Sequence, residues 1–169
     1  MRGCFIFLIF SILVTLCMPL QAEPKPNNAE FTYQLTWDLA TFVEGKTSAQ
    51  IAALPELIQQ QTESFQPNND DETPALWQRH SFKFKHFVIA GAEDPDGMFY
   101  LQNIRFVAPN QRLPNAIQIG ASDSAVRQWL GEPSSLHDNS LIYDAQSNTL
   151  VIELHDGKVQ AVDVIYYFD

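Results

Sequence analysis

Large apolar residues alternate with polar ones in several stretches of the chain, which is the period of a β-strand. Residues 31–37 are predicted as a strand on this ground, with the entry into a helix as the alternative because residues 38–43 break the alternation. Residues 82–90 and 98–107 are also strand-like and rich in aromatic and β-branched side chains. Residues 93–97, EDPDG, favour a turn, so these two strands are predicted to form a hairpin.

A helical pattern lies between these strand-like stretches. Thr47 and Gln50 match the capping box that begins many helices, and apolar residues follow on one stripe. The predicted helix covers residues 47–61, and Pro55 within it predicts either a kink or two short pieces. The polar residues 66–73 are predicted as a loop.

The C-terminal third has the clearest pattern. Ser122 is placed to cap a helix over residues 123–130, and Gly131 ends that helix. The strands predicted after it are residues 141–143, 149–155 and 159–168. Asp156 and Gly157 form the turn between the last two strands. The last strand is apolar on both faces, which predicts a central position in a sheet that is covered on both sides.

Together these elements predict an α+β fold, an antiparallel sheet with short helices packed on one face. A helix followed by strands occurs twice, over residues 43–108 and 117–168, because a glycine, a hydroxyl cap and two apolar residues recur at the same offsets. The pattern allows two tandem units within a single domain, which we place at residues 31–169. Both cysteines, Cys4 and Cys17, precede that domain, so its core must hold without disulfides.

The N-terminus, residues 1–22, has the layout of a secretory signal peptide. A basic second residue is followed by an almost unbroken apolar run from Cys4 to Cys17, and Ala22 supplies a small residue at the cleavage position. The run is shorter than the roughly 20 apolar residues that span a bilayer, which argues against a retained membrane anchor. We therefore expect cleavage near Ala22 and no transmembrane segment in the mature chain.

Export places the mature protein in the periplasm or outside the cell. Lipidation at Cys17 is an alternative that Leu16 disfavours, because lipoprotein signals carry a small residue before the modified cysteine. Residues 23–30 are rich in proline and asparagine and are predicted as a flexible leader. The formal net charge is −10, with no basic patch, so we expect neither nucleic acid nor anionic lipid as a partner.

The chain carries no pattern typical of a catalytic or metal site. The four histidines are His80, His86, His137 and His155. They form neither an HExxH motif nor a helical pair, although the spacing of His80 and His86 can place both on one face of a strand. The acidic clusters at residues 70–72 and 93–96 do not follow calcium-loop spacing. Ser122 is better used as a helix cap than as a nucleophile. No catalytic residue, metal or cofactor is predicted.

Two further features remain as candidates. Glu153 and Asp163 lie on the two strands of one predicted hairpin, where a buried pair could act as acid and base, although two exposed carboxylates are the favoured interpretation. The aromatic residues that include candidate interface anchors are Trp37, Trp77, Trp129, Tyr166 and Tyr167. Most are expected in the core. Because Tyr166 and Tyr167 point to opposite faces, one of the two is predicted to contact a partner.

Residues 117–168 resemble a known family. The residues that carry the resemblance are Gly120, Ser122, Val126, the run Leu130-Gly131-Glu132-Pro133, Tyr143 and the turn Asp156-Gly157-Lys158. This pattern is similar to the SmpA/OmlA type of small envelope protein, which includes an accessory subunit of the outer-membrane β-barrel assembly machinery. The fold of that type is shared with secreted β-lactamase inhibitor proteins, which carry two such units in tandem.

The resemblance implies a fold and a non-enzymatic role, but no particular partner or binding residue. Two features depart from it, because residues 43–108 match poorly and Leu16 departs from the lipoprotein signal usual in the assembly machinery. We therefore expect an exported, non-enzymatic binding or scaffolding protein of the cell envelope that contacts another envelope or secreted protein. The alternatives are a small exported hydrolase or ligand-binding enzyme with a dispersed site, or an inhibitor of a secreted enzyme.

Overall fold

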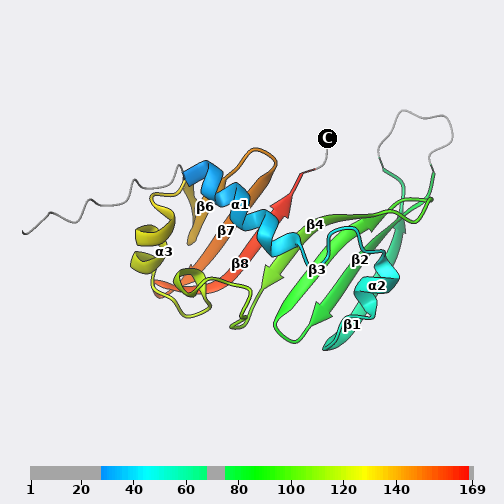
Figure 1. Ribbon diagram of the computed structural model, residues 1–169, viewed down its shortest axis with the longest axis horizontal. Coiled ribbons are helices and arrows are strands. Elements are labelled where there is room, and N and C mark those ends of the chain that lie inside the picture. The colour runs from blue at the N-terminus through cyan, green and yellow to red at the C-terminus, as the bar shows by residue number, and fades with distance from the viewer. Residues whose placement is uncertain (1–27, 68–74, 168–169) are drawn as a thin grey trace, which may run out of the picture.

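The computed structural model describes residues 28–67 and 75–167 (Figure 1). The helices are α1 (Asn28–Ala40), α2 (Ser48–Ala52), a 3-10 helix (Asn115–Ile117) and α3 (Asp123–Leu130). The strands are β1 (Leu57–Phe65), β2 (Trp77–Phe84), β3 (Phe87–Glu93), β4 (Phe99–Phe106), β5 (Ser135–His137), β6 (Ser140–Asp144), β7 (Asn148–His155) and β8 (Lys158–Tyr166). The eight strands of the described residues form one sheet in the order β1-β2-β3-β4-β8-β7-β6-β5, and every neighbouring pair is antiparallel. The predicted α+β fold is confirmed.

Each half of the sheet is a short helix followed by four consecutive strands. Helix α2 precedes β1 to β4, and α3 precedes β5 to β8. The halves meet through their last strands, because β4 pairs with β8 and Phe106 lies opposite Val162. The two predicted units are thus the halves of one continuous sheet, with β8 near its centre.

The core lies on one face of this sheet, where the helices pack. Figure 1 shows α1 crossing over β6, β7 and β8. The strand residues of the core include Phe82, Phe84, Ile89, Ile104, Phe106, Leu150, Ile152, Val162 and Val164, each 0–1 % exposed. The helices contribute Leu35, Leu39, Ile51, Val126 and Leu130. Fully burying one such side chain contributes about 1.5–3 kcal/mol, so this layer dominates the stability of the fold.

The side chains that alternate with these core residues form a second face, here called the open face. Strand pairing places on it Glu63, Trp77, Arg79, Ser81, Lys83, Ala92, Tyr100, Arg105, Glu153 and Asp163. In the described part of the chain, no helix packs on this face. The predicted central position of β8 is confirmed. No helix of the described chain covers its open side, but Ala161 and Asp163 on that side are only 1 % and 8 % exposed, because neighbouring side chains cover them.

The strand predicted over residues 31–37 is wrong, because this segment belongs to α1. Its buried residues are Thr32, Leu35, Thr36, Leu39 and Ala40, which follow the spacing of three and four that defines one side of a helix. Two of them are threonines, which count as polar in a hydropathy pattern and so hid the helical stripe. Helix α1 also includes residues 28–30 of the predicted flexible leader. The rest of that leader and the signal peptide, residues 1–22, lie outside the described residues.

The helix predicted over residues 47–61 is correct only at its beginning. The capping box is confirmed, since Thr47 Oγ1 accepts a hydrogen bond from Gln50 N at 3.3 Å and Thr47 N donates one to Gln50 Oε1 at 3.0 Å. Helix α2 then ends at Ala52, and Glu56 adopts a φ of 66°, a left-handed conformation that helices exclude. Strand β1 begins at the next residue, where pairing with β2 replaces the helical hydrogen bonds.

The single strand predicted over residues 82–90 is in fact parts of two. The chain reverses at Lys85 and His86, so β2 and β3 pair as a hairpin. The predicted hairpin of β3 and β4 is confirmed. Strand β5 escaped prediction because it is only three residues long. Residues 66 and 67 of the predicted loop lie outside regular elements, and its remainder lies outside the described residues.

Local signals in the C-terminal half are confirmed. Ser122 Oγ accepts a hydrogen bond from Ala125 N at 3.2 Å, which caps α3. The turn between β7 and β8 has positive φ at both Asp156 and Gly157, 51° and 70°, as a two-residue hairpin requires. Elsewhere, Gly91 on β3 is required for space, because an added Cβ would lie 2.3 Å from the Phe99 ring.

Candidate functional site

A charged cluster lies at the centre of the open face, on three adjacent strands. Arg105 on β4 stands opposite Asp163 on β8, and Glu153 lies on β7 beyond it. Arg105 Nη1 and Nη2 donate hydrogen bonds to the two carboxylate oxygens of Glu153 at 2.8 and 2.7 Å, and Nη1 also donates to Asp163. Asn103 Nδ2 donates to the other oxygen of Asp163 at 3.3 Å. The predicted pair of carboxylates therefore does come together, but with a guanidinium between its members.

The surroundings of this cluster shift the pKa values of the two carboxyl groups in opposite directions. Burial raises the pKa of Asp163, which is only 8 % exposed, and outweighs the opposing effects of Arg105 and Asn103. The hydrogen bond from Arg105 lowers the pKa of the more exposed Glu153, and the same bond raises the pKa of Arg105. Because both carboxylates are already held by the guanidinium, the geometry favours a brace across three strands over an acid–base pair.

An aromatic cluster lies on the same face, toward the end of the sheet where β1 meets β2. It consists of Phe65, Trp77 and Tyr100, all partly exposed. The Trp77 ring lies 5.5 Å from the Tyr100 ring and 6.5 Å from the Phe65 ring, centroid to centroid. Arg79 covers Phe65 at 4.6 Å and forms an ion pair with Glu63 at 2.7 Å.

Two exposed apolar side chains lie at the same end of the sheet as this cluster. Leu76, which precedes Trp77, is 56 % exposed, and Met98, two residues before Tyr100, is 60 % exposed. The Tyr100 hydroxyl donates to Asp94 Oδ2 at 3.1 Å, which holds the ring in place and raises the pKa of Tyr100. The same end of the sheet therefore presents oriented aromatic rings beside exposed apolar side chains.

The structure separates the two tyrosines that were predicted as partner contacts. Tyr166 is only 8 % exposed, and its hydroxyl donates to Thr36 O at 2.7 Å, so it belongs to the core and is not available to a partner. The helices cover its face of β8, which the even–odd alternation by itself could not assign. Tyr167 is 58 % exposed and remains a predicted contact. Of the aromatic cluster, the sequence identified only Trp77 as a candidate, because its members are joined by the pairing of β1 with β2 and of both β2 and β4 with β3.

The four histidines do not gather at one site. His80 is 4 % exposed on the helix side of β2, stacked on Phe82, with Nδ1 3.0 Å from Thr62 Oγ1. His86 lies in the β2–β3 turn, and His137 and His155 are exposed. In residues 28–67 and 75–167, no three His, Cys, Asp or Glu side chains are grouped as metal ligands would be. The acidic cluster at 70–72 lies outside these ranges, and Asp94 is used in its own turn, accepting hydrogen bonds from the main chain of Asp96 and Met98.

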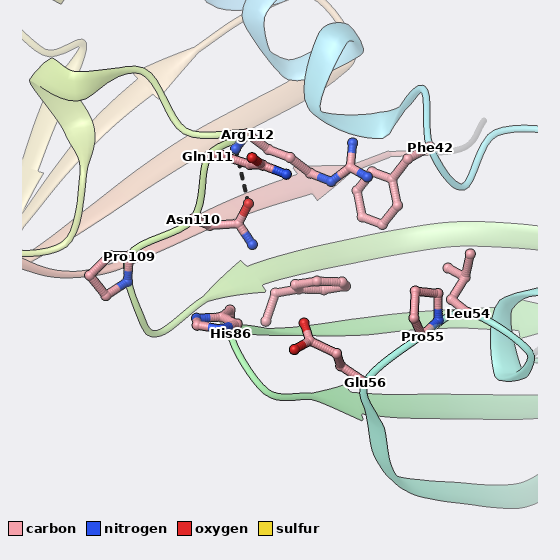
Figure 2. Close-up of a pocket in the computed structure, with 10 residues that line it drawn as sticks. Phe42, Leu54, Pro55, Glu56, His86, Pro109, Asn110, Gln111 and Arg112 are labelled. Atoms are coloured by element: carbon pink, nitrogen blue, oxygen red, sulfur yellow. Dashed lines mark hydrogen bonds between the residues drawn. The ribbon is translucent and has the colours of Figure 1, made fainter.

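A pocket of about 430 Å³ opens on the helix side, next to His86 (Figure 2). Its lining residues are Phe42, Leu54, Pro55, Glu56, His86, Phe87, Pro109, Asn110, Gln111 and Arg112. The lining combines apolar rings with one imidazole, one carboxylate and one guanidinium. An apolar surface with a few convergent polar groups is typical of a site that holds a small ligand.

In the described chain, every helix is too short or too polar to cross a bilayer. No protein-family model, curated protein or solved structure matches the chain. The resemblance of residues 117–168 to the SmpA/OmlA type therefore stays a prediction.

Proposed function

We propose that this protein is an exported, non-enzymatic binding or scaffolding protein of the cell envelope that acts by contact with another envelope or secreted protein. The signal-like layout of residues 1–22 supports export. The open face of the sheet is the surface that this function would use. It is broad, it carries no helix in the described chain, and its strands are fixed by the packed layer on the other side.

The aromatic cluster is the observation that carries this proposal. Phe65, Trp77 and Tyr100 are partly exposed on an uncovered sheet face, with Leu76 and Met98 exposed beside them. Tryptophan and tyrosine are enriched among the residues that dominate binding energy. Their contribution is largest where neighbouring groups exclude water from the contact. A partner would place an aliphatic or aromatic side chain against these rings. Since Arg79 is already paired with Glu63, apolar contact rather than charge would supply most of the affinity.

The charged cluster supports binding over catalysis. Arg105 occupies both Glu153 and Asp163, so neither carboxylate is poised for proton transfer. The charged cluster ties β4, β8 and β7 together at the seam, the line along which β4 and β8 join the two halves of the sheet. A rigid seam keeps the open face in one shape, and a preorganised surface loses less conformational freedom on binding.

The first test is photo-crosslinking at single positions in cells. A photoreactive residue at Lys83, which is exposed on the open face, should give a specific adduct with a partner protein. The same residue at Gln128, exposed on α3, is the control for the opposite side and should not give that adduct. Adducts of equal yield from both positions, or none from Lys83, would contradict the open face as the contact surface.

The affinity of the purified pair then tests the aromatic cluster itself. Trp77→Ala should weaken binding by more than about 1 kcal/mol, or about fivefold. Trp37→Ala is the matched control, because Trp37 is likewise partly exposed but lies on α1. Thermal unfolding of both variants separates lost contact from lost folding. Equal affinities for the two variants would remove the aromatic cluster from the binding site.

A further inference from the structure

The pocket in Figure 2 has a preformed rim. Asn110 N donates a hydrogen bond to Gln118 Oε1 at 3.1 Å, and Gln118 Nε2 donates to Asn110 O at 2.6 Å and Leu113 O at 2.5 Å. Leu113 itself is 2 % exposed, so the segment that carries Arg112 is anchored in the core. A rim held in this way does not have to be ordered by a ligand, which favours binding of small molecules.

The floor of the pocket is aromatic and tied to the core. Phe42 meets Phe87 edge to face, with ring centroids 5.4 Å apart, and Phe87 stacks on the buried Phe84 at 4.6 Å. Leu54 and Pro55 extend the apolar wall. A ring or short aliphatic group placed here would lose water from the face that meets the floor, which is the usual source of affinity in such sites.

One cation stands over this floor. The guanidinium carbon of Arg112 lies 4.1 Å from the centroid of the Phe42 ring. In the described chain, no carboxylate pairs with Arg112. Stacking on the ring fixes the plane of the guanidinium, and a carboxylate that lies in this plane can accept two parallel hydrogen bonds from it.

The opposite side of the pocket restricts the charge of a ligand. Figure 2 shows Glu56 and His86 across from Arg112. Among residues 28–67 and 75–167, the Glu56 carboxylate has only a long ion pair, 4.0 Å, with the exposed Lys85, so its charge acts on the pocket. Repulsion from Glu56 grows with the negative charge of the ligand, so a dianion held at Arg112 would be repelled about twice as strongly as a monoanion. His86 Nδ1 is buried and has no hydrogen-bond partner in the described chain, a rare state that adds unsatisfied polar capacity to this wall.

From these features we infer that the pocket binds a small monocarboxylate with an aromatic or aliphatic body. The carboxylate is held by Arg112, and the body rests on Phe42 and Phe87. The volume of about 430 Å³ lies within the range of ligand pockets and suits a molecule of one ring with a short side chain. This site is on the helix side of the sheet, so it is separate from the open face and independent of the function proposed for that face.

Titration of the purified protein with 3-phenylpropionate and with its neutral amide, 3-phenylpropanamide, tests the inference by calorimetry and NMR. The acid should bind saturably and shift the resonances of residues 109–112. The amide should bind at least about tenfold more weakly than the acid. Arg112→Gln should reduce the affinity for the acid to that for the amide. Lys83→Gln removes an exposed cation on the open face and should change neither affinity.

Phenyl phosphate, a dianion near neutral pH, tests the role of Glu56. It should bind more weakly than the acid, and Glu56→Gln should favour the phosphate more than the acid. The inference is overturned by equal binding of acid and amide, by an unchanged affinity in Arg112→Gln, or by no binding of the acid up to about 10 mM. Tighter binding of the phosphate than of the acid would overturn the choice of a single charge. Thermal unfolding of each variant confirms that the fold is intact.

Discussion

Replacing Thr36 by valine tests the contact that docks α1 onto the sheet. Thr36 is 0 % exposed, and its hydroxyl accepts a hydrogen bond from Asn148 Nδ2 at 3.0 Å and donates one to Tyr33 O at 2.8 Å. Its main-chain oxygen accepts the hydrogen bond from Tyr166. Valine keeps the volume and the β-branching, and its helix propensity is close to that of threonine, so the substitution changes the hydroxyl alone.

The cost of this change follows from what it leaves unpaired. Asn148 on β7 is 2 % exposed, so its amide has no access to water once the hydroxyl is gone. A buried donor left without an acceptor costs about 1–3 kcal/mol. The bond from Thr36 to the Tyr33 carbonyl adds little, because such back-bonding to a helix is at best neutral for its stability. Thr36→Val should therefore lower the free energy of unfolding by about 1–3 kcal/mol.

Urea unfolding followed by circular dichroism measures this difference. The matched control is Thr41→Val, because the Thr41 hydroxyl makes the same kind of bond, to Asp38 O at 2.9 Å, but is exposed to solvent. That control should change stability by less than about 0.5 kcal/mol. Combining Thr36→Val with Asn148→Ala should show a coupling of at least about 0.5 kcal/mol. Equal costs for Thr36→Val and Thr41→Val would refute the idea that a buried polar contact docks the helix.

Two further predictions concern ionisable groups. Arg105→Met should lower the free energy of unfolding by about 1–3 kcal/mol near pH 7, because the nearly buried Asp163 loses its cation. Since burial raises the pKa of Asp163, its carboxyl group becomes protonated as the pH falls, and the cost of the substitution should shrink toward about pH 4. A cost that is the same at both pH values would argue against this origin. Burial raises the pKa of Tyr143 to about 12 and also raises the pKa of Tyr166, so the folded state keeps protons that the unfolded chain loses above about pH 10. These groups should leave the free energy of unfolding unchanged below that pH and lower it above that pH by about 1.4 kcal/mol per pH unit for each tyrosine. Urea titrations from about pH 9 to 11.5 measure this decline, and Tyr166→Phe should make it shallower. A free energy of unfolding that does not change over this pH range would contradict the prediction.

Several elements of this protein were determined by the sequence alone, and each depends on residues within a few positions of one another. Thr47 and Gln50 begin α2, Ser122 begins α3, and Asp156 with Gly157 turns β7 into β8. Caps and tight turns are specified by hydrogen bonds and φ values within a few residues, so a local pattern is sufficient to place them.

Tertiary structure decided the features that join distant segments. Residues 31–37 form a helix despite their alternating pattern, because Thr32 and Thr36 are buried on its inner side. Thr36 is hydrogen-bonded there to Asn148, which lies more than a hundred positions further along the chain. Leu57 enters a strand rather than a helix because β2 supplies the hydrogen bonds that the helix would have made.

The candidate sites were decided in the same way. Only strand pairing brings Phe65, Trp77 and Tyr100 to one face, places Arg105 between Glu153 and Asp163, and sends Tyr166 into the core. Tertiary packing likewise brings Phe42 against Phe87 and Arg112 over the Phe42 ring. A sheet joins residues that are far apart in sequence, so its surfaces depend on the register of the strands, which no local pattern contains.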